Sequence, residues 1–287
     1  MKDFIKNVFA NIVAILLIGI VLFGFIVLFF VASAMSSDQK PYVDSNSVLT
    51  LNFNGNVIDS YTEKEESIFD FGKSKDVLLL DVINAINNAK NDEKIKGISI
   101  EVDELPAGIT QVDDIRAAIE DFKKSGKFVY AYGNNMSQKS YYLASVADKI
   151  YLNPVGMIEL KGMSTEVTFL KDFAAKYGIG VDVIRHGKFK AAVEQFIRND
   201  ISPENKEQLS TLLNDIWGNI STKIKASRKL DDATFKTAVD SLYGFMPELV
   251  VKNKLADQLL QKSEYENLIK KQLKLKSDEK INRISVN

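Results

Sequence analysis

The clearest pattern along the chain is a long apolar run near its amino terminus. Residues 12–34 contain no charged side chain, and no charge lies between Lys6 and Asp38. At ~1.5 Å per residue a helix of this length would measure about 34 Å, which exceeds the ~30 Å hydrocarbon core of a bilayer. Lys2 and Lys6 precede the run, so the positive-inside rule places the amino terminus in the cytoplasm. We expect residues 1–35 to form an uncleaved transmembrane anchor.

A cleaved signal peptide is the competing interpretation of this run, since Ala32-Ser33-Ala34 resembles an A-x-A cleavage site. The apolar region of a signal peptide usually has ~7–15 residues, and this run is longer. We therefore favour an anchor, followed by a linker at 36–47 and a folded domain at 48–287. The folded domain is then expected outside the cytoplasm.

Beyond the linker, apolar residues alternate between the spacings of strands and of helices. For example, Leu79, Val82 and Ile86 recur at helical spacing. Strands that alternate with helices predict βαβ crossovers and a mainly parallel sheet with helices outside, an α/β fold. Strands are expected at 48–53, 97–102, 127–132, 149–152 and 181–185, and helices at 78–90, 112–124 and 137–146.

From Ser202 onward the pattern becomes helical. Ser202 suits an N-cap and Pro203 the first helical position, so a helix is expected from there to about Lys225. Asp231 or Asp232 is expected to cap a second helix. Ser263 to Glu266 has the spacing of a capping box and predicts a third helix.

Composition excludes several kinds of site. The chain has 287 residues, one His, no Cys and a formal net charge of −1. Without Cys there is no disulfide, no thiolate nucleophile and no Cys-ligated metal. A Ser-His-Asp triad would have to use His186. The near-zero charge argues against a nucleic acid partner. There is no GxSxG, Walker A, HExxH or GxGxxG motif, so we expect neither a cofactor nor a metal.

One candidate for chemistry is the segment that follows the strand expected at 181–185. Lys188 and Lys190 lie there beside the apolar Phe189 and Ala191. Ligands bind outside the carboxyl ends of strands in open α/β sheets. A Lys in apolar surroundings loses its charge more easily and can act as general base toward a Ser hydroxyl. The alternative is that both lysines, like His186, are ordinary surface residues.

Two further segments are weaker candidates. Ser137 and Ser140 lie near the start of an expected helix, where a hydroxyl is either a nucleophile or, more commonly, a cap. The turn from Glu104 to Ile109 contains Pro and Gly, and either presents backbone N–H groups as an oxyanion hole or is an ordinary loop.

Three blocks of the chain together resemble a known family. They are LLLDVINAINNAKNDEKIKGISIEV, SGKFVYAYGNNMSQKSYYLASVADKIYLNPVG and VIRHGKFKAAVEQFIRNDISPENKEQ. The last block is the most specific, because its Gly-x-aromatic-Lys-x-Ala-x-Glu-x-Phe pattern continues into Ile-Arg-x-Asp-x-Ser-Pro. The chain resembles the signal peptide peptidase A (protease IV) family of the long, membrane-anchored bacterial type.

This resemblance implies a crotonase-like (ClpP-like) α/β fold and a serine protease that uses a Ser/Lys dyad. Long members contain two tandem repeats, the first supplying the general-base Lys and the second the nucleophilic Ser. The Lys of the motif falls on Lys190. The family also implies bowl-shaped homo-oligomeric rings in the inner membrane, with the catalytic part periplasmic. Its substrates are cleaved signal peptides and other apolar peptides.

The nucleophile of the second repeat has no counterpart in this chain. In second repeats of the family, the nucleophilic Ser lies in a turn of small residues just ahead of an aromatic pair. If that pair is aligned on Tyr141-Tyr142, Gln138 falls at the nucleophile position, and Gln cannot attack a carbonyl. Leu105-Pro106-Ala107-Gly108 replaces the Gly-rich turn of second repeats. The chain therefore resembles a first repeat, and we expect it to have no peptidase activity alone. The alternative is a non-catalytic, membrane-tethered scaffold or peptide-binding subunit. An acyl-CoA enzyme of the crotonase type suits an exported domain poorly.

Overall fold

The chain divides into two units, which are described separately. In the computed structural model, residues 1–35, 43–60, 76–184, 186–187 and 189–286 are described. Contacts separate Met1–Val43 from Asp44–Asn287.

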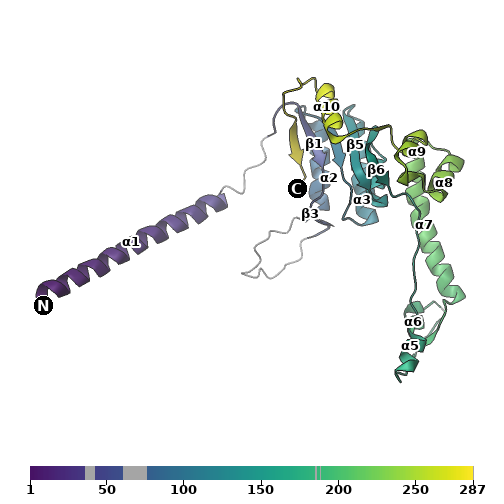
Figure 1. Ribbon diagram of the computed structural model, residues 1–287, viewed down its shortest axis with the longest axis horizontal. Coiled ribbons are helices and arrows are strands. Elements are labelled where there is room, and N and C mark those ends of the chain that lie inside the picture. The colour runs from purple at the N-terminus through teal and green to yellow at the C-terminus, as the bar shows by residue number, and fades with distance from the viewer. Residues whose placement is uncertain (36–42, 61–75, 185, 188, 287) are drawn as a thin grey trace. The chain divides into compact units, whose positions relative to one another are not determined.

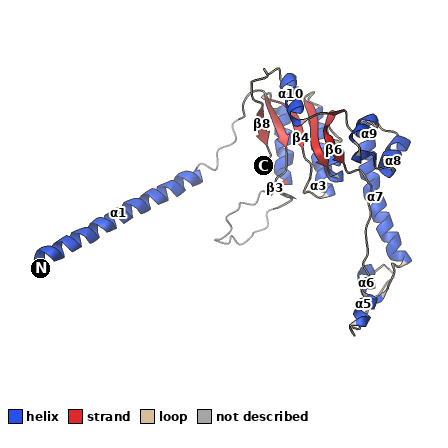
Figure 2. Cartoon of the chain, viewed as in Figure 1, coloured by secondary structure: helices blue, strands red, loops and turns tan. Residues whose placement is uncertain are grey.

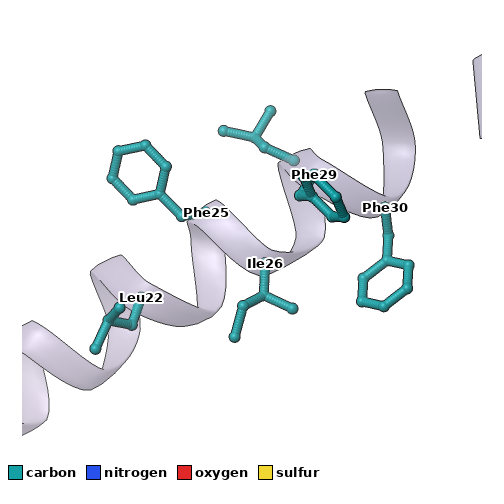
Figure 3. A pocket seen from close by; sticks show the side chains of 6 residues that line it. Leu22, Phe25, Ile26, Phe29 and Phe30 are labelled. Atoms are coloured by element: carbon teal, nitrogen blue, oxygen red, sulfur yellow. The ribbon is translucent and has the colours of Figure 1, made fainter. Parts of the chain in front are cut away.

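The first unit is a single helix, α1, which runs over Lys2–Met35. Its segment Phe4–Phe30 is long and apolar enough to cross a membrane, and none of it is buried within the chain. A run of apolar side chains surrounds the helix without any polar group among them (Figure 3), at Leu22, Phe25, Ile26, Phe29 and Phe30. The bounds of α1 confirm that the segment expected at 1–35 is helical.

The second unit is built on a six-stranded sheet in which every pair is parallel (Figures 1 and 2). Its strand order is β7-β6-β5-β4-β1-β8, and β2 and β3 form a separate parallel pair. The strands are β1 Ser47–Leu51, β2 Val57–Ile58, β3 Val77–Leu78, β4 Ile95–Glu101, β5 Phe128–Met136, β6 Lys149–Ile158, β7 Gln258–Leu259 and β8 Asn282–Ser285. The mainly parallel α/β sheet that the sequence predicts is thus present.

Strand β1 lies between β4 and the edge strand β8. All five of its residues are buried, because helices cover both faces of a parallel sheet. Helices α2 (Leu79–Asn91) and α3 (Ile109–Lys123) pack together on one side of the sheet (Figure 1). They bury their apolar stripes there. The sequence therefore identified these helices correctly from their period, with ends shifted by one to three residues.

Helix α10 (Lys262–Gln272) packs on an aromatic part of the sheet. Its Tyr265 is fully buried and stacks on Tyr132 of β5, with ring centroids 5.0 Å apart. Ile269 and Tyr151 of β6 belong to the same cluster. Aromatic pairs at this separation add stability beyond their buried area, so α10 is held to strands that are distant from it in sequence.

The helices that precede α10 follow the predicted capping chemistry. Ser202 accepts a hydrogen bond from the backbone N–H of Asn205 (3.1 Å) and starts α7 (Pro203–Arg228). Asp231, not Asp232, caps the next helix. The remaining helices of this part are α8 Asp232–Asp240, η3 Tyr243–Phe245 and α9 Pro247–Lys252.

Two predictions need correction. The capping box expected at Ser263 to Glu266 lies two residues earlier, where the Gln261 N–H donates to Glu264 Oε2 (2.7 Å). The start of α10 is set by the preceding strand, since the Leu260 N–H bonds to the Leu152 carbonyl (2.9 Å).

The second correction concerns the strand expected at 181–185. Residues 181–184 form no strand in the described structure, and Arg185 lies outside the described residues. A strand needs a neighbour for its backbone N–H and C=O groups. The outer edge of β6 is already paired with β7. Residues 181–184 instead belong to an arm, 163–201, that connects β6 to α7 and contains α5 (Lys171–Lys176), η2 (Ala191–Val193) and α6 (Glu194–Ile197).

Candidate functional site

The arm carries Lys190, the residue that the sequence singles out as a base. Lys190 immediately precedes η2, with φ −102° and ψ 78°. Its side chain is exposed in the single chain, as are His186 and Phe189 beside it, and Lys188 lies outside the described residues.

Glu194 lies four residues after Lys190. Among the described residues of the arm, it is the most deeply buried. It is 1% exposed, and its Oε2 accepts from the Ser202 N–H (3.3 Å) and from Asn205 Nδ2 (3.1 Å). Hydrogen bonding by the Ser202 side chain and backbone, and then by Asn205, lowers the pKa of Glu194. The carboxylate thus fastens η2 and α6 to the first turn of α7.

The residues between Glu194 and α7 form a local turn held by an ion pair. Arg198 donates from its NH2 to Asp200 Oδ1 (2.9 Å) and from its Nε to the Asp200 carbonyl (3.0 Å). Ser202 then caps α7, and Pro203 occupies its first position. Much of the Glu-x-Phe-Ile-Arg-x-Asp-x-Ser-Pro motif therefore shapes the segment that carries Lys190. The sequence alone assigned Glu194 no role, because its partners are eight and eleven residues away.

The start of α4 (Gln138–Ala144) shows what the two candidate serines do. Ser137 Oγ accepts from the Ser140 N–H (3.3 Å) and lies 2.9 Å from Ser140 Oγ. Ser140 is completely buried. Ser137 is therefore a helix cap, and Ser140 is out of reach of a substrate. The alternative that both are structural has the support of these contacts.

Gln138, which the sequence comparison by motif is expected to align with the nucleophile, has a fully engaged side chain. Its Oε1 accepts from the N–H groups of Lys161 and Gly162, both at 3.1 Å, and its Nε2 donates to the Gly162 carbonyl (3.0 Å). The side-chain amide thus both accepts hydrogen bonds from the backbone of this loop and donates one to it, as a backbone amide does in a sheet. The Gln138 side chain therefore holds this loop against the start of α4.

The turn at Glu104 to Ile109 is an ordinary loop. The Ala107 N–H donates to the Leu105 carbonyl (2.8 Å), and the Gly108 N–H donates to Gln111 Oε1 (2.7 Å). Both donors that an oxyanion hole would need are already satisfied. Gly108 and Gln111 form the cap of α3 instead.

Asp103 and two asparagines near the end of β5 form a polar cluster at the carboxyl edge of the sheet. The N–H groups of Asn134 and Asn135 donate to Asp103 Oδ1, at 2.6 and 3.1 Å. A Cβ on Gly156 would lie 2.1 Å from the Asn134 carbonyl oxygen, so only Gly fits there. The cluster shapes the irregular end of β5.

A second ionisable cluster joins α10 to the sheet. Burial alone would raise the pKa of Glu101, but hydrogen bonds from Lys262 and Ser99 and the charge of Arg283 lower it. Arg283 NH1 lies 2.7 Å from Glu101 Oε1, and Ser99 Oγ lies 2.6 Å from the Tyr265 hydroxyl. Each charge has a partner, so the cluster stabilises the fold and offers no free acid or base.

Among the residues that the structure describes, no group of three or more His, Asp or Glu side chains has an arrangement that could hold a metal ion.

Comparison with known proteins gives the chain a family. Residues 121–276 match Peptidase family S49. The chain is 33% identical to Protease 4 of Haemophilus influenzae over 224 residues, which are 75% of this chain and 36% of that protein. It is 35% identical to Protease 4 of Salmonella typhi over 214 residues, 70% of this chain and 35% of that protein. It thus spans about a third of the length of these relatives.

Solved structures with a similar course of the chain include a membrane-bound stomatin-specific protease. That structure has a TM-score of 0.44, 10% identity and a match over 84% of this chain and 97% of its own. An enoyl-CoA hydratase from Geobacillus kaustophilus has a TM-score of 0.30 and 13% identity, over 83% of this chain and 96% of its own. Both scores lie below 0.5, so we base no conclusion on them. The family match covers more than half of the sequence, and the chain therefore belongs to peptidase family S49.

Proposed function

We propose that this chain is the base-bearing half of a membrane-anchored serine endopeptidase that works with a Ser/Lys dyad. Family membership carries the proposal, because the matched residues 121–276 include Lys190 and the relatives are named proteases. The proposed substrates are cleaved signal peptides and other apolar peptides. The proposed location is the bacterial inner membrane, with α1 as the anchor, the amino terminus in the cytoplasm and the second unit outside.

In the proposed reaction, Lys190 Nζ is neutral and accepts the hydroxyl proton of a Ser that lies outside this chain. The Ser oxygen attacks the scissile carbonyl carbon, and the carbonyl oxygen takes the negative charge. When the C–N bond breaks, Lys190 returns the proton to the leaving amine, and an ester to the Ser remains. Lys190 Nζ then takes a proton from a water molecule, whose oxygen attacks the ester carbonyl; the acid product leaves, and the proton returns to the Ser oxygen.

The contacts at the start of α4 support a nucleophile from elsewhere. Ser137 is engaged as a cap, Ser140 is buried, and the Gln138 amide is held by the loop at Lys161 and Gly162. A second, Ser-bearing repeat or partner chain would supply the missing hydroxyl.

The apolar surface of the arm supports a partner that covers Lys190. Ile184 is fully exposed, and Phe173, Tyr177 and Phe189 each expose more than half of their surface. Monomeric proteins rarely expose so many large apolar side chains together. We propose that homo-oligomerisation covers them, and that the resulting desolvation of Lys190 favours its neutral form.

A non-catalytic scaffold or peptide-binding subunit is the second candidate. The exposure of Lys190 in the single chain and the Gln at the nucleophile position favour it. The two candidates differ in whether any Ser-bearing partner yields activity.

Complementation tests the proposal. The purified chain alone should not cleave a synthetic signal peptide, and cleavage should appear when it is produced with its native Ser-bearing half, in one frame or as a separate chain. A serine-directed fluorophosphonate probe should label that half and leave this chain unlabelled. Cleavage by this chain alone, or no cleavage with any Ser-bearing partner, would contradict the proposal.

A further inference from the structure

The edge of the sheet at which β4 and β5 begin contains a hollow of about 390 Å³. It lies beside the entry of the chain into β1 and the end of α10. Its charged lining consists of three lysines, Lys96, Lys127 and Lys274, and Asn46 and Ser125 add polar groups. No acidic side chain lines the hollow among the described residues.

Asp92 and Glu93 act electrostatically on Lys127 and offset part of the positive charge at this edge. Asp121 is held by Lys90 (2.6 Å) and Lys124 (3.2 Å). The segment 270–280, which follows the hollow from α10 onward, has five lysines and two acidic residues. Lys96 and Lys274 are exposed. The edge therefore presents a positive surface to solvent, and such a surface attracts anions over about a Debye length.

Two of the three lysines have their ammonium groups held by backbone carbonyls. Lys127 Nζ donates to the carbonyls of Ala89 and Asp92, both at 2.7 Å, at the end of α2. Lys96 Nζ bonds to the Glu93 carbonyl (2.7 Å). These bonds use backbone oxygens, which carry no full negative charge. These bonds orient the two ammonium groups.

The chain that leaves α1 enters the second unit at this hollow. Asn46 lines the hollow, and its Nδ2 donates to the Leu273 carbonyl at the end of α10 (3.0 Å). Only eleven positions separate Met35, the last residue of α1, from Asn46. At ~3.3–3.6 Å per residue this connection spans at most about 40 Å. Because this connection is short, it keeps the lysine-lined hollow close to any bilayer that holds α1. The effective concentration of lipid headgroups at the hollow is then high.

We propose that the lysine-lined hollow and its rim bind the anionic phospholipid headgroups of the membrane in which α1 is anchored. The inference rests on the membrane anchorage of the proposed function. An ammonium pairs with a lipid phosphate as a point charge, and several lysines next to a membrane segment attract anionic lipids together. The apolar helix and the basic surface would then both contribute to binding the same membrane.

Lysine reactivity in nanodiscs tests the inference on the full chain. The chain is reconstituted in discs of phosphatidylcholine alone, or of phosphatidylcholine mixed with phosphatidylglycerol, and treated with a water-soluble acetylating reagent. Mass spectrometry then gives the labelling rate of each lysine. We expect Lys96 and Lys274 to be labelled several-fold more slowly in the anionic discs. Lys161 and Lys206, which are exposed elsewhere, should react equally in both, and added salt should remove the protection.

A charge-reversed variant shows whether the hollow itself is responsible. In Lys96→Glu/Lys274→Glu, we expect the neighbouring Lys276 to lose its lipid-dependent protection. The matched variant Lys161→Glu/Lys206→Glu should keep it. Thermal unfolding of both variants serves as the check on folding, and each variant is compared with itself in the two lipids.

The possible outcomes separate this inference from the proposed function. If the chain does not copurify with discs at all, membrane anchorage is wrong, and the inference falls with it. If the chain enters the discs but Lys96 and Lys274 react equally in both lipids, only the headgroup inference is overturned. It is also overturned if inorganic phosphate with phosphatidylcholine discs gives the same protection, since the hollow would then be a site for free phosphate.

Discussion

The bond between Glu194 and α7 offers a direct test of how the segment that carries Lys190 is held. The change is Glu194→Ala. It removes two hydrogen bonds to a carboxylate and leaves the Ser202 N–H and the Asn205 amide without that acceptor. Hydrogen bonds to charged groups contribute ~1.5–3 kcal/mol each, and we take the low end because the rest of the segment is exposed to water. The expected loss of local stability is about 2–3 kcal/mol.

Hydrogen exchange measures this loss where it occurs. A destabilisation of about 2–3 kcal/mol raises the population of the locally open state by roughly 30- to 150-fold. Backbone amides in peptides that cover 190–210 should exchange faster by about that factor. Amides of the central strands β4 and β5 should be unchanged. The matched control is Glu207→Ala, which removes an exposed glutamate from the same helix.

The pH dependence has a definite sign. The pKa of Glu194 is lowered in the folded chain relative to its ordinary value of 4.5. Its contribution is therefore fully present above about pH 4.5 and is lost as the pH falls through the lower folded value. Protection of 190–210 in the unaltered chain should decrease in that window, and in Glu194→Ala it should not. Equal exchange in Glu194→Ala and Glu207→Ala would refute the role assigned to Glu194.

Three further changes test other parts of the structure. Arg116→Ala should lower the free energy of unfolding by about 3 kcal/mol in a urea titration, because the buried guanidinium bonds to the Tyr142 carbonyl, Ser145 Oγ and Ser227 Oγ; a loss below about 1 kcal/mol would contradict this. Tyr265→Phe should cost about 1 kcal/mol, since only the bond to Ser99 is lost, and an unchanged midpoint would argue against it. Ile184→Asp should shift the chain toward monomer in light scattering in detergent, whereas an unchanged mass would show that the arm does not form the contact.

Helical period and capping residues were enough to predict most of the fold. The spacing of Leu79, Val82 and Ile86 placed α2, and Ser202-Pro203 placed the start of α7 within a residue. Both signals are local, and they depend on side chains within one turn of each other.

The failures occurred where distant segments decide the structure. The apolar residues at 181–184 have strand-like character, but β7 already pairs with the edge of β6. The short strand β8 was missed because only its pairing with β1, more than 230 residues earlier, makes it a strand. A pattern of hydrophobicity carries no information about which edges are taken.

The site was predictable only in part for the same reason. The motif singled out Lys190, and the side chain of Lys190 is exposed in the single chain. The structural role of Glu194 depends on Ser202 and Asn205 across a turn. Ser137 and the turn at Gly108 each had a catalytic and a structural interpretation. Their hydrogen bonds show that both cap helices, and a sequence does not contain that geometry.

The central claim is that Lys190 is the general base of a Ser/Lys dyad. The most direct measurement is the rate of signal-peptide cleavage by the chain together with its native Ser-bearing half, as a function of pH. We predict that Lys190→Ala lowers kcat/KM by at least ~100-fold and removes the limb on which kcat/KM rises with pH, whereas Lys188→Ala retains both. Comparable activity in Lys190→Ala and the unaltered protein, or an equal loss in Lys188→Ala, would contradict the account.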